Sequence, residues 1–271
     1  MAILADMHMH SGFSGDSKAP MEEMVKTAIQ KGLSQICFTE HFDKDYFDEN
    51  GVPTDMFHLN ADSYLYDLLM MREQYAGQIR ILFGVEVGVQ PHLKKDLTIF
   101  VNEHDYDFVL SSTHVVDGKD PYYPAFMNAF PEEVRMKVYL EEVRKNLDAF
   151  KIFDSLAHLD YACRYFPQGA AYNLKEVEGT VEEILSFLIK HEKALEVNSG
   201  AFRHGLPTTN PRREILSMYR EMGGELITIG SDAHKPVDIA YGYEQTAALL
   251  KELGFKCYYV YERRTPEAFS I

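Results

Sequence analysis

The chain has 271 residues, of which 46% are hydrophobic and 25% are charged, and its formal net charge is −15 at pH 7. The composition is that of an ordinary globular protein, and the length suits one large α/β domain or two small ones. A long nucleic-acid groove normally needs a basic face, and a membrane span needs about 18 or more apolar residues in a row, so the sequence argues against both.

The N-terminus and the cysteines favour a protein that stays inside the cell. No basic region followed by a long apolar stretch begins the chain, so we expect no signal peptide. The three cysteines, Cys37, Cys163 and Cys257, lie far apart and none belongs to a CxxC pair. We therefore expect reduced structural thiols and a cytoplasmic location.

Short apolar segments alternate with amphipathic segments along the chain. Strands are predicted at residues 3–7, 35–39, 79–87, 108–112, 152–157, 194–197, 226–229 and 255–261. Helices are predicted at residues 21–31, 61–76, 91–103, 131–150, 180–191 and 236–253, and in a further segment that Asn210 caps, Pro211 begins and Met222 ends. About seven or eight repeated β-then-α units predict a parallel sheet closed into a barrel. Because no repeat or linker divides the chain, residues 1–271 are expected to form a single domain.

Two long connections interrupt this regular alternation, at residues 42–60 and 115–130. Loops of this length in a compact domain are usually lids or binding loops, although surface decoration is the alternative. We expect both of them to border a functional site.

A metal-binding pattern begins at the first predicted strand, which ends in MHMH. Side chains alternate across a strand, so His8 and His10 point to the same side. Two imidazoles at one strand end can hold a cation, but a lone HxH is also compatible with two polar residues that simply leave a strand. The rest of the chain has to decide between these interpretations.

Most of the other predicted strands also end on residues that bind metals. Of the 11 histidines, those that follow predicted strands are His8, His10, His41, His114, His158 and His234, and the acidic or amide residues at strand ends are Glu40, Glu86, Glu196, Asn198 and Asp232. The carboxyl ends of barrel strands form the active face of β/α barrels, so these side chains should converge. Imidazole and carboxylate ligands together suit Zn, Mn or Fe, and their number exceeds what one tetrahedral ion uses, so two or three divalent ions are expected. Glu86 is the candidate bridge between ions.

These motifs together resemble the PHP (polymerase and histidinol phosphatase) superfamily over essentially the whole chain. The HxH motif, the TEH and STH strand ends and the final DxH motif all have counterparts in that family. Carried over residue by residue, the resemblance implies a trinuclear ligand set of His8, His10, Asp16, His41, Glu86, His114, His158, Asp232 and His234. It also implies an α/β fold, a distorted β/α barrel of seven strands, whereas the strand count leaves seven or eight open.

Within the superfamily, length and layout resemble the stand-alone histidinol-phosphate phosphatases, since no polymerase is appended. The resemblance implies hydrolysis of L-histidinol phosphate to L-histidinol and phosphate in histidine biosynthesis. Clustered divalent ions suit this chemistry because they neutralise phosphoryl oxygens and acidify water, so a metal-bridging hydroxide is the expected nucleophile. The expected partner is a small phosphomonoester, with no long nucleic acid and no membrane. The sequence leaves the oligomeric state open.

Basic residues just beyond the ligand-bearing strand ends are candidates for binding the phosphoryl group. Arg164 and Arg203 suit bidentate phosphate binding, although each could instead form a surface salt bridge. Lys235 and Ser199 are further candidates for phosphate contact. His204 is a candidate for protonating the leaving alkoxide, and metal-activated water is the alternative.

Histidinol phosphate carries an ammonium group and an imidazole, so its pocket should offer carboxylates and an aromatic wall. Asp43, Asp160 and Tyr161 lie in suitable strand-end loops. They are therefore candidate substrate-binding residues.

Three other functions remain open at this stage. A PHP-type nuclease or nucleotide phosphatase would use the same metal site, and the acidic surface argues only against long polynucleotides. A non-catalytic metal-binding domain would be expected to lack some ligands, whereas this set appears complete. An amidohydrolase-type barrel also begins with HxH, but many of its members place a lysine where this chain has Glu86.

Overall fold

Seven parallel strands form the central sheet of the computed structural model, which describes residues 2–166 and 172–271. Their order is β1-β2-β5-β6-β7-β8-β9. Their bounds are Ala5–Met9, Gln35–Phe42, Arg80–Gly88, Phe108–Ser112, Ser155–Leu156, Ala194–Asn198 and Ile227–Gly230. Strands β2, β5 and β6 are buried almost throughout, as is typical of a parallel sheet covered by helices. The seven-stranded β/α barrel implied by the family resemblance is confirmed.

The first and last strands of this sheet meet and nearly close the barrel. Met9, at the end of β1, forms an isolated parallel bridge with Ala233. The backbone N–H of His10 donates to the Ala233 carbonyl at 2.9 Å, and the N–H of Asp232 donates to the His8 carbonyl at 2.8 Å. The closure therefore brings the HxH and DxH motifs together, although more than 220 positions separate them.

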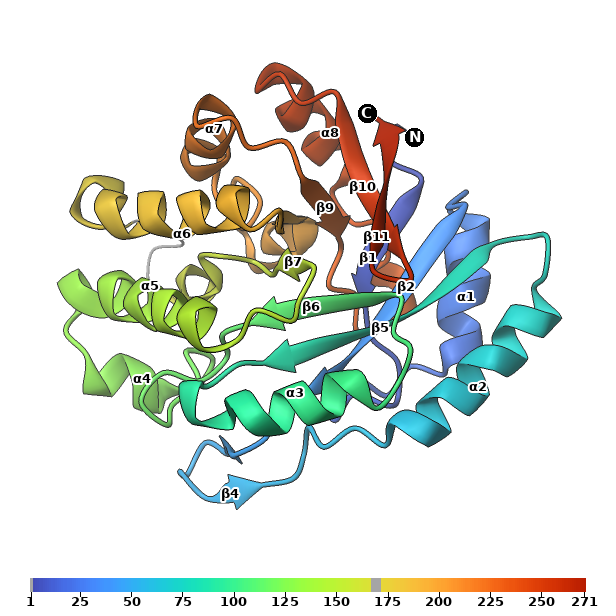
Figure 1. Ribbon diagram of the computed structural model, residues 1–271, viewed down its shortest axis with the longest axis horizontal. Helices are drawn as coiled ribbons and strands as arrows, with labels where there is room; N and C mark the ends of the chain where they lie inside the picture. Colours follow the sequence, from blue (N-terminus) through green and yellow to red (C-terminus); the bar gives the residue numbers. More distant parts are fainter. Residues whose placement is uncertain (1, 167–171) are drawn as a thin grey trace.

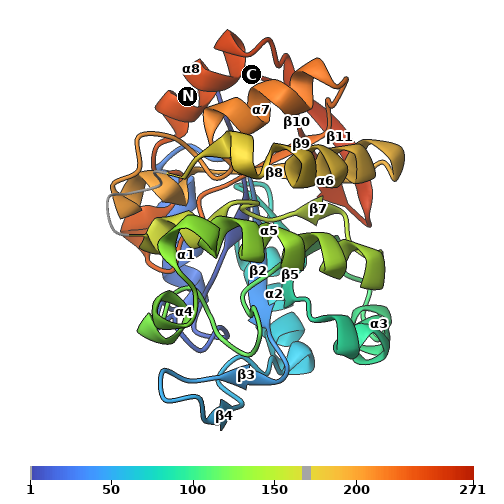
Figure 2. The same cartoon turned by 90° about the vertical axis from the view of Figure 1, so that its left-hand side faces the viewer.

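Helices surround the sheet, as Figures 1 and 2 show. The α-helices are α1 (Met21–Gln30), α2 (Ala61–Gln74), α3 (Lys94–Asn102), α4 (Pro124–Ala129), α5 (Glu132–Ala149), α6 (Glu178–Lys190), α7 (Arg213–Glu221) and α8 (Tyr243–Glu252). Short 3₁₀ helices lie at Pro91–Leu93, Tyr161–Tyr165, Leu174–Glu176, Ser199–His204 and Pro236–Asp238. One apolar core reaches from Ile3 to Tyr261, and the single domain stays a prediction. In the described part of the chain, no helix combines the length and hydropathy that a membrane span requires.

The last predicted strand forms, but it does not join the barrel. Residues 255–261 contain β10 (Cys257–Glu262), which pairs antiparallel with β11 (Thr265–Ser270). The turn of this hairpin covers the amino-terminal end of the barrel, where the Arg264 N–H donates to the carbonyl of Asp107, just before β6. Because β10 alternates between buried and half-buried side chains, its pattern is that of a strand with one open face rather than of a buried barrel strand.

Two predicted helices begin later than expected. The Asn210–Pro211 bond is cis, and the helix α7 starts only at Arg213 because the Asn210 side chain is bonded to Asp160 and Arg164 instead of capping a helix. The segment at residues 236–253 is a short 3₁₀ helix followed by α8. Ala240 and Gly242, at φ of 53° and 72°, interrupt it because no α-helix continues through the left-handed region.

The two long connections carry small elements of their own. Residues 42–60 contain β3 (Tyr46–Phe47) and β4 (Pro53–Thr54), which form the hairpin that projects from the molecule in Figure 2. Residues 115–130 contain α4. The Tyr46 hydroxyl donates to Asp120 Oδ2 at 2.6 Å, so the two connections are joined beside the carboxyl ends of the strands.

Candidate metal centre

The nine predicted ligands gather at one place, the carboxyl end of the barrel. His8 lies on β1 and His10 follows it directly, while His41 and Glu86 are on the neighbouring strands β2 and β5. The remaining ligands, Asp16, His114, His158, Asp232 and His234, lie in the loops that follow strands β1, β6, β7 and β9. The parallel order of the sheet brings residues from distant parts of the sequence to a single site.

Glu86 lies at the middle of this cluster and is fully buried. Its Oε2 is 3.0 Å from His8 Nε2 and 3.3 Å from His41 Nδ1. Its Oε1 is 3.0 Å from His158 Nε2 and 3.2 Å from His114 Nε2. Both oxygens therefore face separate sets of imidazoles, an arrangement that would let one carboxylate bridge two ions.

The HxH pair presents two ring nitrogens to the same point. The Ser14 hydroxyl donates to Glu40 Oε2 at 2.6 Å, so its oxygen accepts from His10 Nδ1 at 3.0 Å. His8 Nδ1 lies 2.6 Å from a carboxylate oxygen of Glu196, which can only accept. With both Nδ1 atoms protonated, the Nε2 atoms carry free lone pairs, yet they lie 3.1 Å apart. Two facing lone pairs at this distance repel unless a proton or a metal cation lies between them.

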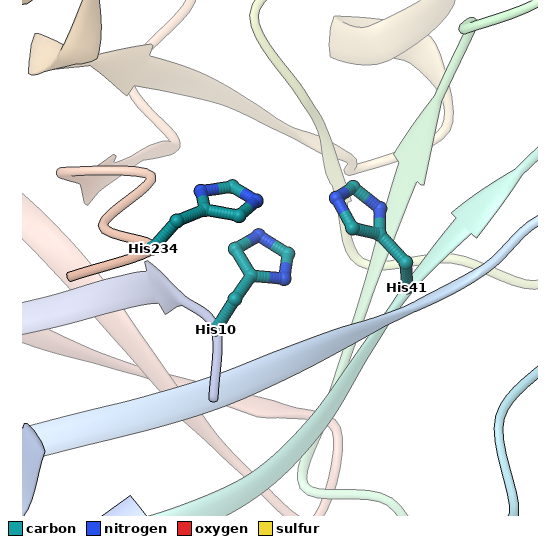
Figure 3. Close-up of side chains that lie close together, drawn as sticks. All are labelled: His10, His41 and His234. Atoms are coloured by element: carbon teal, nitrogen blue, oxygen red, sulfur yellow. The ribbon is translucent and has the colours of Figure 1, made fainter. Parts of the chain in front are cut away.

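A second set of imidazoles faces the outer side of the cluster. Figure 3 shows His10, His41 and His234 with their rings close together. The His10 ring is stacked on both others, with centroid distances of 4.3 Å to His41 and 4.1 Å to His234. Asp16 Oδ2 lies 3.0 Å from His234 Nε2 and 3.8 Å from His41 Nε2. Among the described residues, His234 Nε2 and His41 Nδ1 are buried without a hydrogen bond, as expected of atoms that bind a cation.

The donor atoms form four overlapping groups, and within each group they lie no more than 4.8 Å apart. The groups are His8, His10 and Asp232; His8, Glu86 and His158; His41, Glu86 and His114; and His10, His41 and His234. Shared members link all four, so the nitrogen and carboxylate donors form one continuous cluster. This chemistry fits divalent ions such as zinc.

Electrostatics also favour added positive charge at the centre. Burial disfavours the charged form of His8, but Glu196, Glu86 and Asp232 outweigh it and raise the pKa of His8 well above its usual value. Burial also opposes protonation of His41, yet Glu86 and Asp16 raise its pKa to about 9. By contrast, burial together with His234 and His41 lowers the pKa of His10. Protonation is therefore favoured at His8 and His41 but not at His10, whereas divalent cations would contact all the donor atoms.

Two of the ligands have an unusual backbone conformation. His158 and Asp232 have φ values of 21° and 56°, which are uncommon for residues with a side chain. Both end short strands, and the left-handed turn there ends the extended segment and redirects the chain. Strain of this kind is typical of functional sites.

Arg164 lies beside the centre, and each of its three guanidinium nitrogens donates one hydrogen bond to a protein group. It donates to Asp232 Oδ2 at 2.7 Å, to Asn210 Oδ1 at 2.7 Å and to Asn198 Oδ1 at 2.8 Å. The first of these bonds orients Asp232, one of the predicted ligands. Phosphate binding by Arg164 stays a prediction.

The other predicted phosphate-binding residues lie around the same edge. Arg203 donates to the carbonyls of Ser231 and Asp232 at 2.6 and 2.7 Å, and the buried Ser199 hydroxyl donates to the Gly230 carbonyl at 3.2 Å. Lys235 is exposed, and His204 is only partly covered by its neighbours. Their roles, like that of Arg203, stay predictions.

The predicted substrate-binding residues are less uniform in position. Tyr161 packs beside the centre, with its ring 4.9 Å from that of His158 and 5.6 Å from that of His114. Asp43 is buried, and its Oδ1 lies 2.7 Å from His114 Nδ1. Asp160 is turned to another partner set, since it accepts from Asn210 Nδ2 at 2.7 Å and from the Arg212 N–H at 3.1 Å.

Several residues that support the ligands were not assigned a role from the sequence. Glu40 accepts from the Ser11 N–H and from the Ser14 hydroxyl, and Ser112 donates to Glu86. Glu196 contacts His8. Glu40 and Glu196 do stand at strand ends, so their position gave a signal, but nothing in the sequence says which imidazole each one meets.

The fold and the site together define a β/α-barrel protein with a candidate centre for divalent metal ions. The PHP domain family model matches residues 6–200, and the chain belongs to that family.

Proteins of similar sequence and structure carry one recurring name. The chain is 34% identical to a probable histidinol-phosphatase of Thermotoga maritima, over 93% of this chain and 94% of that protein. It is 31% identical to a histidinol-phosphatase of Lactococcus lactis, over 92% and 91% of the two chains. The crystal structure of histidinol phosphate phosphatase from Lactococcus lactis, complexed with zinc, L-histidinol and phosphate, superposes with a TM-score of 0.87, at 28% identity, over 97% of this chain and 98% of that one.

Proposed function

We propose that this chain is a metal-dependent phosphatase that hydrolyses L-histidinol phosphate to L-histidinol and phosphate in histidine biosynthesis. The observation that carries the proposal is the set of imidazole lone pairs and carboxylates that face one another at the barrel mouth, above all His8 Nε2 and His10 Nε2 at 3.1 Å. The names of the similar proteins, which match over nearly their whole length, support the substrate.

The proposed cofactors are two or three divalent ions, of Zn, Mn or Fe. His8, His10 and Asp232 would hold one ion, and His41, Glu86 and His114 another, with His158 also facing Glu86. Asp16, His41 and His234 are the donors for a third. When bound, such ions would neutralise phosphoryl oxygens and lower the pKa of water.

The chain's own groups hold these donors in place before any substrate arrives. His10, His114 and His234 each direct Nδ1 toward a fixed oxygen, on Ser14, on Asp43 and on the Asp232 backbone. Each ring therefore keeps its Nε2 directed inward. A preorganised centre of this kind needs little rearrangement when negative charge develops on the phosphoryl group.

His204 is poorly suited to donate a proton to the leaving alkoxide at neutral pH. Partial burial, with Arg164 nearby, lowers its pKa to about 4, so the imidazole is neutral near pH 7. In that state it can accept or donate a neutral hydrogen bond at the edge of the site. Its role as general acid stays a proposal, and so do phosphate contacts from Arg203, Ser199 and Lys235.

The proposed partner is a small phosphomonoester, bound against the ring of Tyr161. The net charge of −15 disfavours a long polynucleotide in the same place. We also propose a cytoplasmic location, as suits a soluble biosynthetic enzyme.

The test is phosphate release by protein reconstituted with zinc or manganese. L-histidinol phosphate is compared with p-nitrophenyl phosphate, a nucleoside monophosphate and a short single-stranded oligonucleotide. We expect a kcat/KM for histidinol phosphate at least about a hundredfold above the others, equivalent to roughly 2.7 kcal/mol of transition-state discrimination. Preference for the nucleotide or oligonucleotide would overturn the proposed substrate. Inactivity toward all four compounds with metal bound would overturn the proposal that the protein is a phosphatase.

The substitution Asp43→Asn separates two roles for that carboxylate. If Asp43 binds the ammonium group, the substitution should raise KM for histidinol phosphate and leave KM for p-nitrophenyl phosphate unchanged. Because Asp43 is buried and bonded to His114, we expect instead that kcat/KM falls for both substrates by a similar factor, about 10- to 100-fold. A loss confined to the cationic substrate would restore the ammonium-binding role.

A further inference from the structure

Glu196 contacts two of the predicted ligands, His8 and His158. It sits on β8, and only 1% of its surface is exposed. Its Oε1 lies 2.6 Å from His8 Nδ1, on the first strand of the barrel. Its Oε2 accepts from the backbone N–H of His158 at 2.8 Å. One carboxylate therefore contacts two predicted ligands, His8 and His158, which are 150 positions apart in sequence.

Each of these two bonds fixes a different property. A carboxylate can only accept, so a proton of His8 is held on Nδ1, and Nε2 is the ring nitrogen directed at Glu86 and Asp232. The bond to the His158 N–H holds the backbone of a residue whose φ is 21°. Without an acceptor there, that buried N–H would be unsatisfied and the strained turn less well held.

The sheet is built closely around this carboxylate. A Cβ atom at Gly230, on β9, would lie 2.3 Å from His8 Cβ and 2.5 Å from Glu196 Oε1, so no side chain fits there. The Asn198 amide donates to Glu196 Oε2 at 3.1 Å, and Arg164 in turn donates to Asn198 Oδ1 at 2.8 Å. Glu196 is thus held in one place by packing on one side and by hydrogen bonds on the other.

We propose that Glu196 is a positioning residue that sets the ring orientation of His8 and the backbone of His158, and so determines the affinity of the centre for divalent ions. The inference rests on the proposed metal centre and goes beyond its ligand list. Glu196 itself does not face the other donors. It acts through the two ligands that it contacts.

The substitution Glu196→Gln tests this role with little change of shape. Glutamine has one acceptor oxygen and one NH₂ group, so it can accept from His8 or from the His158 N–H, but not from both. We expect zinc affinity, measured by competition with a chromophoric chelator and without substrate, to fall about 10- to 100-fold. In the zinc-loaded variant, NMR of ¹⁵N-labelled histidine should show that His8 no longer populates the Nδ1–H tautomer alone.

Asp154→Asn is the matched control. Asp154 is also buried, and it accepts from the Val109 N–H at 2.8 Å and from Arg264 at the opposite end of the barrel. This variant should lower the melting temperature of the metal-free protein and leave zinc affinity and the His8 tautomer as in the wild type. A loss of zinc affinity equal to that of Glu196→Gln would mean that any weakening of the barrel has this effect, and would overturn the proposal.

Glu196→Asp provides a second, independent test. Aspartate keeps the charge but is one methylene shorter, so it cannot reach both His8 and His158. We expect zinc affinity to fall as in Glu196→Gln; wild-type affinity in either variant would overturn the positioning role. Because no substrate is used, a wild-type chain that binds zinc but leaves histidinol phosphate intact would overturn the proposed function and leave this inference standing.

Discussion

Replacing Glu86 by glutamine is expected to lower kcat/KM for histidinol phosphate by about 10³-fold or more, equivalent to roughly 4 kcal/mol of transition-state stabilisation. Glu86 has oxygens within 3.3 Å of four different imidazoles, and it is the only carboxylate in two of the four donor groups of the described residues. Glutamine keeps the size but offers a single neutral acceptor. Zinc content measured by atomic absorption should fall together with activity.

A control variant distinguishes this effect from general loss of stability. Asp107→Asn changes another buried carboxylate, which accepts from the Phe83 N–H and from Arg72 at the amino-terminal end of the barrel. It should lower stability and leave kcat/KM of the folded fraction within a few-fold. If Glu86→Gln kept its full zinc content and more than a tenth of wild-type activity, Glu86 could not be the central bridging carboxylate.

The ligand positions could be predicted because their signal is local. Each strand of a parallel barrel is a short apolar run, and a polar residue that can bind metal at its end is visible without any knowledge of the fold. His41, for example, ends QICFTEH, and Glu86 is the penultimate residue of RILFGVEV. The register pairs these two residues directly across β2 and β5. The barrel topology then supplies the convergence that the sequence alone does not show.

The partners of the long side chains could not be predicted in the same way. Phosphate binding by Arg164 stays a prediction, but nothing in the sequence indicated its three hydrogen bonds, which go to residues 34 to 68 positions further along the chain. The Asn210 side chain is bonded to Arg164 and Asp160, whereas the sequence pattern suggested a helix cap. Contacts of this kind depend on loop conformations, which apolar periodicity does not encode.

The position of the last strand also depends on contacts that apolar periodicity does not encode. The sequence predicts a strand at β10, but whether that strand enters the sheet depends on the gap between β1 and β9. That gap is already closed by the Met9–Ala233 bridge. An eighth strand has no place to pair, so β10 forms a hairpin with β11 instead.

Replacing Arg164 by leucine is expected to destabilise the metal-free protein by about 3–5 kcal/mol, the usual cost of removing one partner from a buried ion pair. The side chains of Arg164 and Asp232 are only 3% and 8% exposed. Their removal from water is compensated by the contact at 2.7 Å and by the two asparagine acceptors. Leucine would leave Asp232 charged and buried, facing Asn198 and Asn210 without their donor. Denaturant unfolding of chelator-treated protein at pH 7 measures the loss.

The pH dependence gives a second, signed result. Burial raises the pKa of Asp232, but His8 and Arg164 outweigh it and hold that pKa well below its usual value. A group whose pKa is depressed by folding contributes stability above its unfolded pKa, about 3.9 for aspartate, and loses it as the pH falls through the native pKa. The stability difference between wild type and Arg164→Leu should therefore be full at pH 7 and shrink below about pH 4.

The surface pair between Arg213 and Glu252 provides the comparison for this prediction. Its side chains are 46% and 65% exposed, so Arg213→Leu should change stability by about 1 kcal/mol or less. If Arg164→Leu cost no more than Arg213→Leu, the guanidinium would not be neutralising Asp232, and Arg164 would be free to bind phosphate as the sequence suggested. A loss of stability several times larger, which is smaller in Arg164→Lys, would show that the main role of Arg164 is to neutralise Asp232.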